Sequence, residues 1–419
     1  MKKLLRALGP GLLTGAADDD PSGIATYSQT GAQLGYALCW TMFLTTPFMV
    51  AVQIVSARIG SVTGRGLAAN LQQVMPPLLL YALLAVFALA NVFNIAADVA
   101  AMGQAVRLVI GGPAMLYSLC LGAVCLWAQI AIPYRSYARG MKVLTLVLFA
   151  YVAAAFSVDI PWSEVAASTF IPRMSLNRNF ILMLVAVLGT TISPYLFFWQ
   201  ASLEVEERRL MDKKKEAPLD KANKSAGKRF GPIVTDTWTG MALSNVIGFF
   251  IITTTAATLH AHGVNDVGTA AQAAEALRPL AGRFAFLLFS LGIVGTGLLA
   301  IPALAGSAAY ALADALSWKG SLGLRLGRAR GFYLLIGGAT VIGALGAMSP
   351  LNPVTMLVWS AVFNGIVAVP LMAGIMLVVT NLKVMGKFAA APLLALFGWS
   401  ATLFMGLVVA AFFVTTVID

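Results

Sequence analysis

Residues 9–23 read GPGLLTGAADDDPSG and lie in the first long apolar segment of the chain. Within them, Asp18, Asp19 and Asp20 occupy positions where a membrane-spanning helix should be apolar, and a carboxylate at that depth is costly. Pro21 has no backbone N–H and Gly23 lowers helical propensity, so we expect the helix to stop here and restart. Unwound backbone is tolerated at bilayer depth only around a buried or water-filled cavity. The stretch therefore predicts an ion site built from carboxylates and free backbone carbonyls.

The alternative is that these aspartates face water at a helix end. Asp20 lies 14 residues after Arg6, the last cation of the amino terminus. In a helix, that separation spans roughly 21 Å of a hydrocarbon core about 30 Å thick. This depth favours the buried site.

The composition is that of a membrane protein. The chain is 59% hydrophobic and 11% charged, against about 25% charged residues in soluble proteins. The apolar segments predict an all-α protein with eleven membrane-spanning helices. They lie roughly at residues 4–31, 37–57, 77–110, 115–133, 141–158, 179–207, 233–258, 283–316, 332–348, 353–380 and 390–417.

The distribution of Lys and Arg predicts the orientation. With the amino terminus in the cytoplasm, 23 of the 28 cations fall in cytoplasmic segments, which is a strong positive-inside signal. An odd number of spans then puts the carboxyl terminus outside. The net charge of +11 follows from this topology and from contact with membrane lipid, so no nucleic-acid partner is expected.

The sixth predicted span is interrupted as well, at GTTISPY (residues 189–195). Pro194 frees the carbonyl four residues earlier, that of Thr190. Two broken helices at corresponding positions of two halves indicate a transporter with its site between inverted repeats. The repeats would cover about 4–158 and 179–380, with a cytoplasmic linker at 209–232 and a peripheral helix at 390–417.

These motifs make the chain resemble the Nramp family of metal-ion transporters, closest to its bacterial magnesium-transporting branch. The shared features are GPG at 9–11, the Asp-Pro pair, AADVAAMGQA at 96–105 and the broken sixth span. The resemblance covers nearly the whole chain. It implies a LeuT-type fold with helices 1 and 6 broken, in the inner membrane of a bacterium.

The resemblance also implies the ligands. Nramp transporters bind transition metals with Asp-Pro-Gly-Asn in span one and Met-Pro-His in span six, where this chain has DPSG and SPY. Asp20 is kept as a metal ligand, and Ala17 and Thr190 would supply carbonyl oxygens. Gly23 replaces the amide ligand and Ser193 the thioether ligand.

Oxygen ligands suit Mg²⁺ and Mn²⁺, whereas thioethers favour softer metals. Mg²⁺ also keeps several of its waters in most protein sites. We therefore expect import of partly hydrated Mg²⁺ or Mn²⁺ by alternating access, with no cofactor, in a protein that functions as a monomer.

A proton relay of the family type is largely missing. Nramp proteins carry acids in span three, where the matching residues are Asn91, Asp98 and Ala101, and Tyr195 and Gln200 stand at the positions of two histidines. Proton coupling is therefore not expected. Asp98 is a group that supports the ion, a residual proton acceptor, or a buried carboxylate bonded to Ser, Thr or Tyr.

Other polar residues fall near this predicted site. Asp18 and Asp19 would raise the local negative potential, or one of them would cap the restarted helix. Asn364 would line the pocket or make an interhelical hydrogen bond. Glu204, Glu206 and Glu207 fit solvated charges at the inner mouth.

Three other functions are alternatives to this one. A proton-coupled Mn²⁺ or Fe²⁺ carrier of the Nramp type conflicts with the missing soft ligand and relay acids. A LeuT-type carrier of an organic solute would place an anion among three aspartates. An intramembrane aspartyl protease would use Asp20 and Asp98, but its Gly-Asp motif is absent from the sequence. The chain is therefore expected not to be an enzyme.

Overall fold

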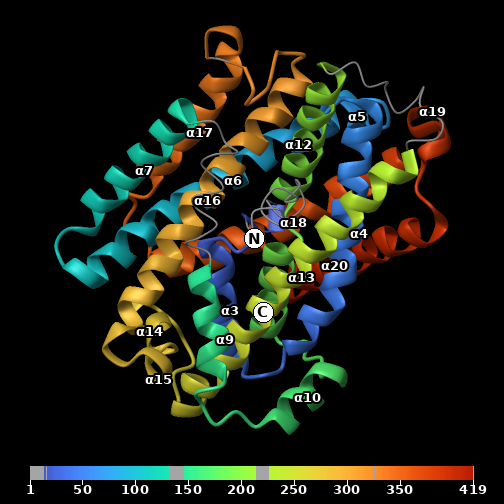
Figure 1. The fold of residues 1–419 in the computed structure, drawn as a ribbon. Coiled ribbons are helices and arrows are strands. Elements are labelled where there is room, and N and C mark those ends of the chain that lie inside the picture. Colours follow the sequence, from blue (N-terminus) through green and yellow to red (C-terminus); the bar gives the residue numbers. More distant parts are fainter. Residues whose placement is uncertain (1–13, 16, 133–145, 214–225, 325, 419) are drawn as a thin grey trace.

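The computed structural model describes residues 14–15, 17–132, 146–213, 226–324 and 326–418, and these fold into a bundle of helices (Figure 1). The helices are α3 (Pro21–Leu34), α4 (Cys39–Thr63), α5 (Leu67–Leu71), α6 (Pro77–Ile110), α7 (Ala114–Ala131), α9 (Phe149–Ala155), α10 (Trp162–Phe170), α11 (Arg178–Thr191), α12 (Pro194–Lys213), α13 (Ala226–Thr258), α14 (Ala270–Glu275), α15 (Arg278–Ala281), α16 (Ala285–Ala315), α17 (Arg330–Gly346), α18 (Pro353–Thr380), α19 (Leu382–Met385) and α20 (Pro392–Ile418).

Local sequence accounts for the ends of the long helices. Helix α6 begins at Pro77, because the N–H of the first helical residue has no partner within the helix and proline lacks it at no cost. At its carboxyl end the helix is capped by Gly111, with φ +73°. Helix α18 begins at Pro353, and the Asn352 side chain accepts hydrogen bonds from the first free N–H groups. Both helices have the bounds that their apolar runs predicted, 77–110 and 353–380.

Within the described residues, eight helical segments are long and apolar enough to cross a membrane. The fifth and ninth predicted spans contain shorter apolar helices, at Leu146–Ala155 and Arg330–Gly346. The first predicted span begins outside the described residues. The fold is therefore all-helical and membrane-spanning as predicted, while the total of eleven spans and the repeat bounds remain predictions.

The predicted linker at 209–232 lies partly outside the described residues. Helix α12 continues to Lys213 and α13 already begins at Ala226, so both helices extend into it. The described ends of α12 and α13 thus account for part of the predicted linker, and the linker itself remains a prediction.

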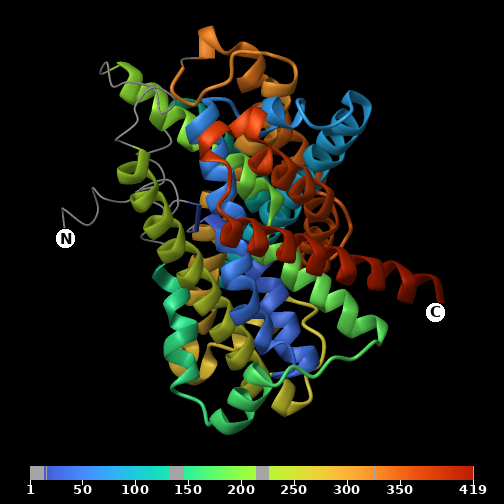
Figure 2. The same ribbon diagram turned by 90° about the vertical axis from the view of Figure 1, so that its right-hand side faces the viewer.

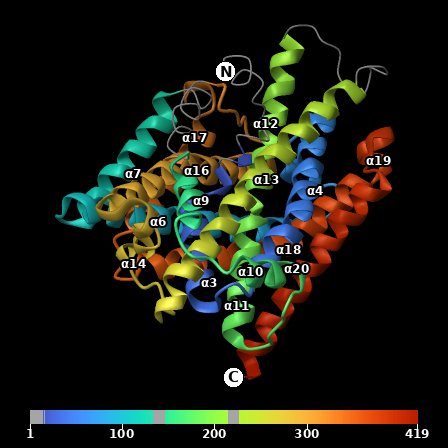
Figure 3. The same cartoon turned by 60° about the horizontal axis from the view of Figure 1, so that its bottom comes forward.

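The broken sixth span lies at the centre of the bundle. In the apolar window of Arg178–Arg209, 94% of the residues are buried, against 22% for α7 and 33% for α20. Figure 3 shows α7 and α20 on opposite sides, with α3 and α13 between them. The carboxyl-terminal end of α20 projects away from its neighbours (Figure 2). Burial of the interrupted span places its free backbone groups away from lipid.

Close glycine contacts hold the central helices together. A Cβ atom added to Gly189 on α11 would lie 2.0 Å from the Ala361 carbonyl oxygen and 2.5 Å from the Gly365 nitrogen, both on α18. Such small-residue contacts let transmembrane helices approach closely. They bring α18 against the break in the sixth span.

Gly189→Ala is therefore expected to destabilise the protein by about 1–3 kcal/mol, because the added methyl group overpacks a backbone contact. Thermal unfolding in detergent measures the change. The matched control is Gly338→Ala on α17, where an added Cβ meets nothing within 4 Å. Equal melting temperatures for the two variants would contradict the packing argument.

Candidate functional site

The first break lies at Asp19 and Asp20. Residues 17–18 are helical, the next two are not, and α3 starts at Pro21. Asp20 caps α3: its Oδ1 accepts hydrogen bonds from the Gly23 backbone N–H at 2.8 Å and from the Ser22 hydroxyl at 2.6 Å. The side chain is only 1% exposed. The predicted stop and restart is therefore present, and it buries a carboxylate.

The second break separates α11 from α12 at Ile192 and Ser193. The Ser193 hydroxyl lies 2.8 Å from the Gly189 carbonyl oxygen and 2.9 Å from that of Thr190. It has one proton to share between them. Because Pro194 brings no N–H to the Thr190 carbonyl, that carbonyl turns to a side chain instead.

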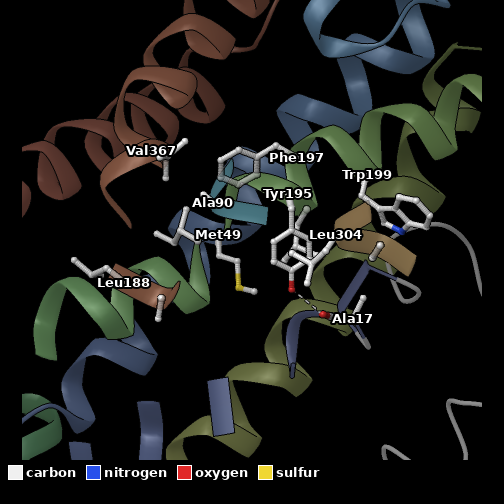
Figure 4. Packing of buried hydrophobic residues seen from close by; sticks show 14 of the residues in the cluster. Ala17, Met49, Ala90, Leu188, Tyr195, Phe197, Trp199, Leu304 and Val367 are labelled. Atoms are coloured by element: carbon white, nitrogen blue, oxygen red, sulfur yellow. Dashed lines mark hydrogen bonds between the residues drawn. The ribbon is translucent and has the colours of Figure 1, made fainter. Parts of the chain in front are cut away.

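The two breaks contact each other. The Tyr195 hydroxyl, on the first turn of α12, donates a hydrogen bond to the Ala17 carbonyl at 2.9 Å (Figure 4). A Cβ atom added to Gly23 would lie 3.1 Å from the Thr190 Oγ1 and 3.6 Å from the Asp20 Oδ1. The fold thus brings together site residues predicted from two distant stretches of sequence. They are Ala17, Asp20 and Gly23 from the first stretch, and Thr190 and Tyr195 from the second.

A residue that the sequence analysis missed also contacts Asp20. The Nδ2 of Asn94, on α6, donates a hydrogen bond to the Asp20 Oδ2 at 3.0 Å. With this bond, both oxygens of the central carboxylate have partners. The signal in the sequence was the spacing of Asn91, Asn94 and Asp98, which places three polar side chains on one face of an apolar helix.

Asp18 and Asp19 turn toward a different helix. The Ser244 hydroxyl of α13 lies 2.5 Å from the Asp18 Oδ2 and 2.8 Å from the Asp19 Oδ1. One proton cannot serve both oxygens fully, so two carboxylates share one donor. They are 2% and 6% exposed, and the alternative of water-facing aspartates is wrong.

Asn91 and Asp98 occupy α6 beside the same region. The Asn91 amide donates to the Leu304 carbonyl at 3.1 Å and to the Ser307 Oγ at 3.0 Å. Neither carboxylate oxygen of Asp98 has a hydrogen-bond partner among the described residues. The alternative of an Asp98 carboxylate bonded to Ser, Thr or Tyr is therefore wrong for this part of the chain.

Asn364 and Gln200 differ in their surroundings. Asn364 is fully buried next to the Gly189–Gly365 contact, and within the described residues neither of its amide atoms has a hydrogen-bond partner. The interhelical hydrogen bond considered for it is not present there. Gln200 instead accepts a bond from Thr14 and donates one to Glu204 at 3.4 Å.

The glutamates of α12 are not solvated as a group. Glu204 is only 5% exposed. Glu206 accepts hydrogen bonds from the Tyr310 hydroxyl and from the Leu322 backbone N–H. The expected solvated charge is therefore wrong for Glu204, which is buried. Glu206 is partly buried and is held by α16 and the loop after it.

The junction offers mainly oxygen ligands: the Asp20 carboxylate, two backbone carbonyls and the Ser193 hydroxyl. Each carbonyl already accepts one bond, which leaves it a second lone pair. The described residues contain no group of three or more His, Cys, Asp or Glu side chains placed to hold a metal ion. Chemically, the arrangement suits a hard cation that keeps part of its water.

Comparisons with known proteins identify the family of the chain. The family model described as "Natural resistance-associated macrophage protein-like", Nramp, matches residues 11–415. A divalent metal cation transporter MntH of Pectobacterium carotovorum is 27% identical over 307 residues, 71% of this chain and 69% of the relative. An MntH of Yersinia enterocolitica is 28% identical over 308 residues, 70% of this chain and 69% of the relative.

Solved structures show the same fold. A manganese transporter of Eremococcus coleocola superimposes with a TM-score of 0.72 at 16% identity, covering 97% of this chain and 86% of that one. Mhp1, a nucleobase-cation-symport-1 family transporter, gives a TM-score of 0.55 at 16% identity, covering 96% and 92%. The LeuT-type architecture that the resemblance to the Nramp family implies is confirmed.

Proposed function

As a member of the Nramp family, the chain is an integral membrane transporter of divalent metal cations and not an enzyme, and we propose that it imports Mg²⁺ and Mn²⁺ as partly hydrated ions. The observation that carries this proposal is the junction of the two breaks. There a buried carboxylate lies among backbone carbonyls, and Gly23 and Ser193 stand where the family has an amide and a thioether.

Each residue of the junction has a proposed role. Asp20 binds the cation directly or through one water, and the Ala17 and Thr190 carbonyls use their free lone pairs for the ion or its waters. Ser193 contacts a coordinating water. Gly23 leaves the room that a hydrated ion needs, since its missing side chain would face Thr190 and Asp20.

The surrounding residues are proposed to set the field and the shape of the pocket. Asp18 and Asp19 add negative charge behind the ion, where it attracts a cation. Tyr195 ties the two breaks together, and Asn364 lines the pocket from α18. We further propose that the protein works as a monomer, with its amino terminus in the cytoplasm and its carboxyl terminus outside.

Transport of Mg²⁺, Mn²⁺ and Ca²⁺, each in turn, into sealed vesicles tests the proposal. We expect Mg²⁺ and Mn²⁺ to enter and Ca²⁺ to enter poorly. Vesicles without the protein give the background leak. Entry of Mn²⁺ without Mg²⁺ would favour the second candidate, a proton-coupled Mn²⁺ or Fe²⁺ carrier; the similar MntH proteins are named divalent metal cation transporters.

We also propose that transport is not coupled to protons. Asn91, Ala101 and Gln200 carry no titratable group, and Tyr195 has an ordinary pKa of about 10. Asp98 then lacks, at these four positions, the titratable groups of the family's proton relay. A negative-inside potential of 100 mV offers a divalent cation about 4.6 kcal/mol, which suffices for uptake.

The prediction is that Mg²⁺ entry leaves the pH inside the vesicles unchanged. A pH-sensitive dye at clamped potential measures this, with Asp98→Asn as the matched variant. Internal acidification that follows Mg²⁺ entry and disappears in Asp98→Asn would refute uncoupled transport and would make Asp98 the proton carrier.

A further inference from the structure

Three polar residues form a row on α6 beside Asp20. Asn91, Asn94 and Asp98 are spaced by three and four residues, so their side chains share one face of the helix. All three are fully buried. Four of their oxygens have no hydrogen-bond partner among the described residues: the Asn91 Oδ1, the Asn94 Oδ1 and both carboxylate oxygens of Asp98. We call these three residues the acceptor row.

The chemistry around each amide fixes its orientation. The Asn94 Nδ2 faces the Asp20 carboxylate, so a flipped amide would set an oxygen against that anion. The Asn91 Nδ2 faces the Leu304 carbonyl and the Ser307 Oγ, which itself donates to Leu304. In both cases the amide oxygen must point to the side that offers no donor.

The two amide oxygens are acceptors, as is at least one oxygen of Asp98, and buried acceptors without donors are costly. Their missing partner must therefore donate hydrogen bonds and tolerate nearby carboxylates. Asp98 lies within electrostatic reach of Asp20, which disfavours an anion. An apolar ligand would leave the oxygens unpaired. Water held by a divalent cation meets both conditions, because the ion polarises its O–H groups toward acceptors.

We propose that the acceptor row binds the water shell of the cation held at Asp20, with the Asn94 Oδ1 as its central acceptor. Asn94 then supplies from α6 the amide oxygen that Gly23 fails to supply from α3. This inference rests on the proposed transport of hydrated Mg²⁺, and it adds a residue that determines specificity. Mg²⁺ depends on the row more than Mn²⁺, because Mg²⁺ releases its waters reluctantly.

Asn94→Leu and Asn94→Asp separate the two halves of the amide. The leucine removes the acceptor and the donor. The aspartate keeps an acceptor oxygen but sets a second oxygen against Asp20 in place of the amide donor, which should lower the uptake of both ions alike. We expect Asn94→Leu to lower the ratio of Mg²⁺ to Mn²⁺ uptake by about tenfold, the scale of one hydrogen bond to a charged partner. Asn94→Asp should leave that ratio within about twofold of the wild type, the scale of a few tenths of a kcal/mol.

Asn70→Ala is the matched control, because Asn70 is another fully buried asparagine with an unpartnered Oδ1 among the described residues, on α5. It should leave the ion ratio unchanged. If Asn94→Leu fails to fold, Asn94→Ala removes the same oxygen without added bulk and should lower the ratio in the same way.

Equal losses of Mg²⁺ and Mn²⁺ uptake in Asn94→Leu and Asn94→Asp would overturn the inference, since they would show that Asn94 only orients Asp20. An unchanged ratio of Mg²⁺ to Mn²⁺ uptake in a well-folded Asn94→Leu would also overturn the inference. Normal Mg²⁺ uptake by the wild type would then leave the proposed function standing. A wild type that carries no Mg²⁺ overturns both.

Discussion

Replacing Asp20 is expected to remove almost all divalent-cation transport, by about a hundredfold or more, equivalent to about 2.7 kcal/mol. Asp20 is the carboxylate at which the two broken helices meet, and its removal leaves only neutral oxygens at the junction. Asp20→Ala also deletes the cap of α3, where Asp20 accepts the Gly23 N–H. Loss of such a cap costs about 0.5–2 kcal/mol of stability.

Asp20→Asn is the sharper variant, because asparagine caps helices as well as aspartate does but carries no charge. We expect it to melt near the wild-type temperature and to lose transport nearly as fully as Asp20→Ala. Initial Mg²⁺ uptake at matched protein levels, together with thermal unfolding, measures both effects. Wild-type uptake by Asp20→Asn would show that the carboxylate does not bind the ion.

The double variant Gly23→Asn with Ser193→Met is expected to raise the ratio of Mn²⁺ to Mg²⁺ uptake by about tenfold or more. A thioether prefers softer metals to Mg²⁺, and two longer side chains leave less room for water. An asparagine at position 23 would point its Cβ toward Thr190 at 3.1 Å, so the Thr190 side chain must yield by a few tenths of an ångström. Ser193→Met also releases the Thr190 carbonyl from its hydroxyl partner.

Ser193→Ala is the control for this switch, since it removes the same hydroxyl without adding sulfur. We expect it to reduce uptake of both ions with little change in their ratio. Competition of unlabelled Mg²⁺ against Mn²⁺ uptake gives the ratio in each variant. The same ratio in the double variant as in the wild type would show that these positions do not set selectivity.

The sequence predicts the backbone of the site better than its side-chain contacts. Proline and consecutive aspartates in apolar runs are local signals, and they place both breaks correctly at Asp20 and Ser193. The bounds of α6 and α18 also follow from local composition. In each case the residues that end or start a helix lie within a few positions of its boundary.

Contacts between distant helices were harder to foresee. Ser244 and Asn94 lie 225 and 74 residues from the aspartates that they contact, and no local pattern pairs them. Asn94 is uncharged and lies between Asn91 and Asp98, so the resemblance to the family gives no reason to select it. The burial of Glu204 likewise depends on neighbours that the local sequence does not contain.

The zero-flux potential of Mg²⁺ tests the central claim most directly. With Mg²⁺ tenfold higher outside the vesicles, uncoupled transport should stop at about +30 mV inside, the equilibrium value for two charges. A pH gradient of one unit should leave that potential unchanged, and Asp20→Asn should abolish the flux that defines it. A shift of about 20 mV per pH unit, as expected when one proton accompanies each Mg²⁺, would contradict the account.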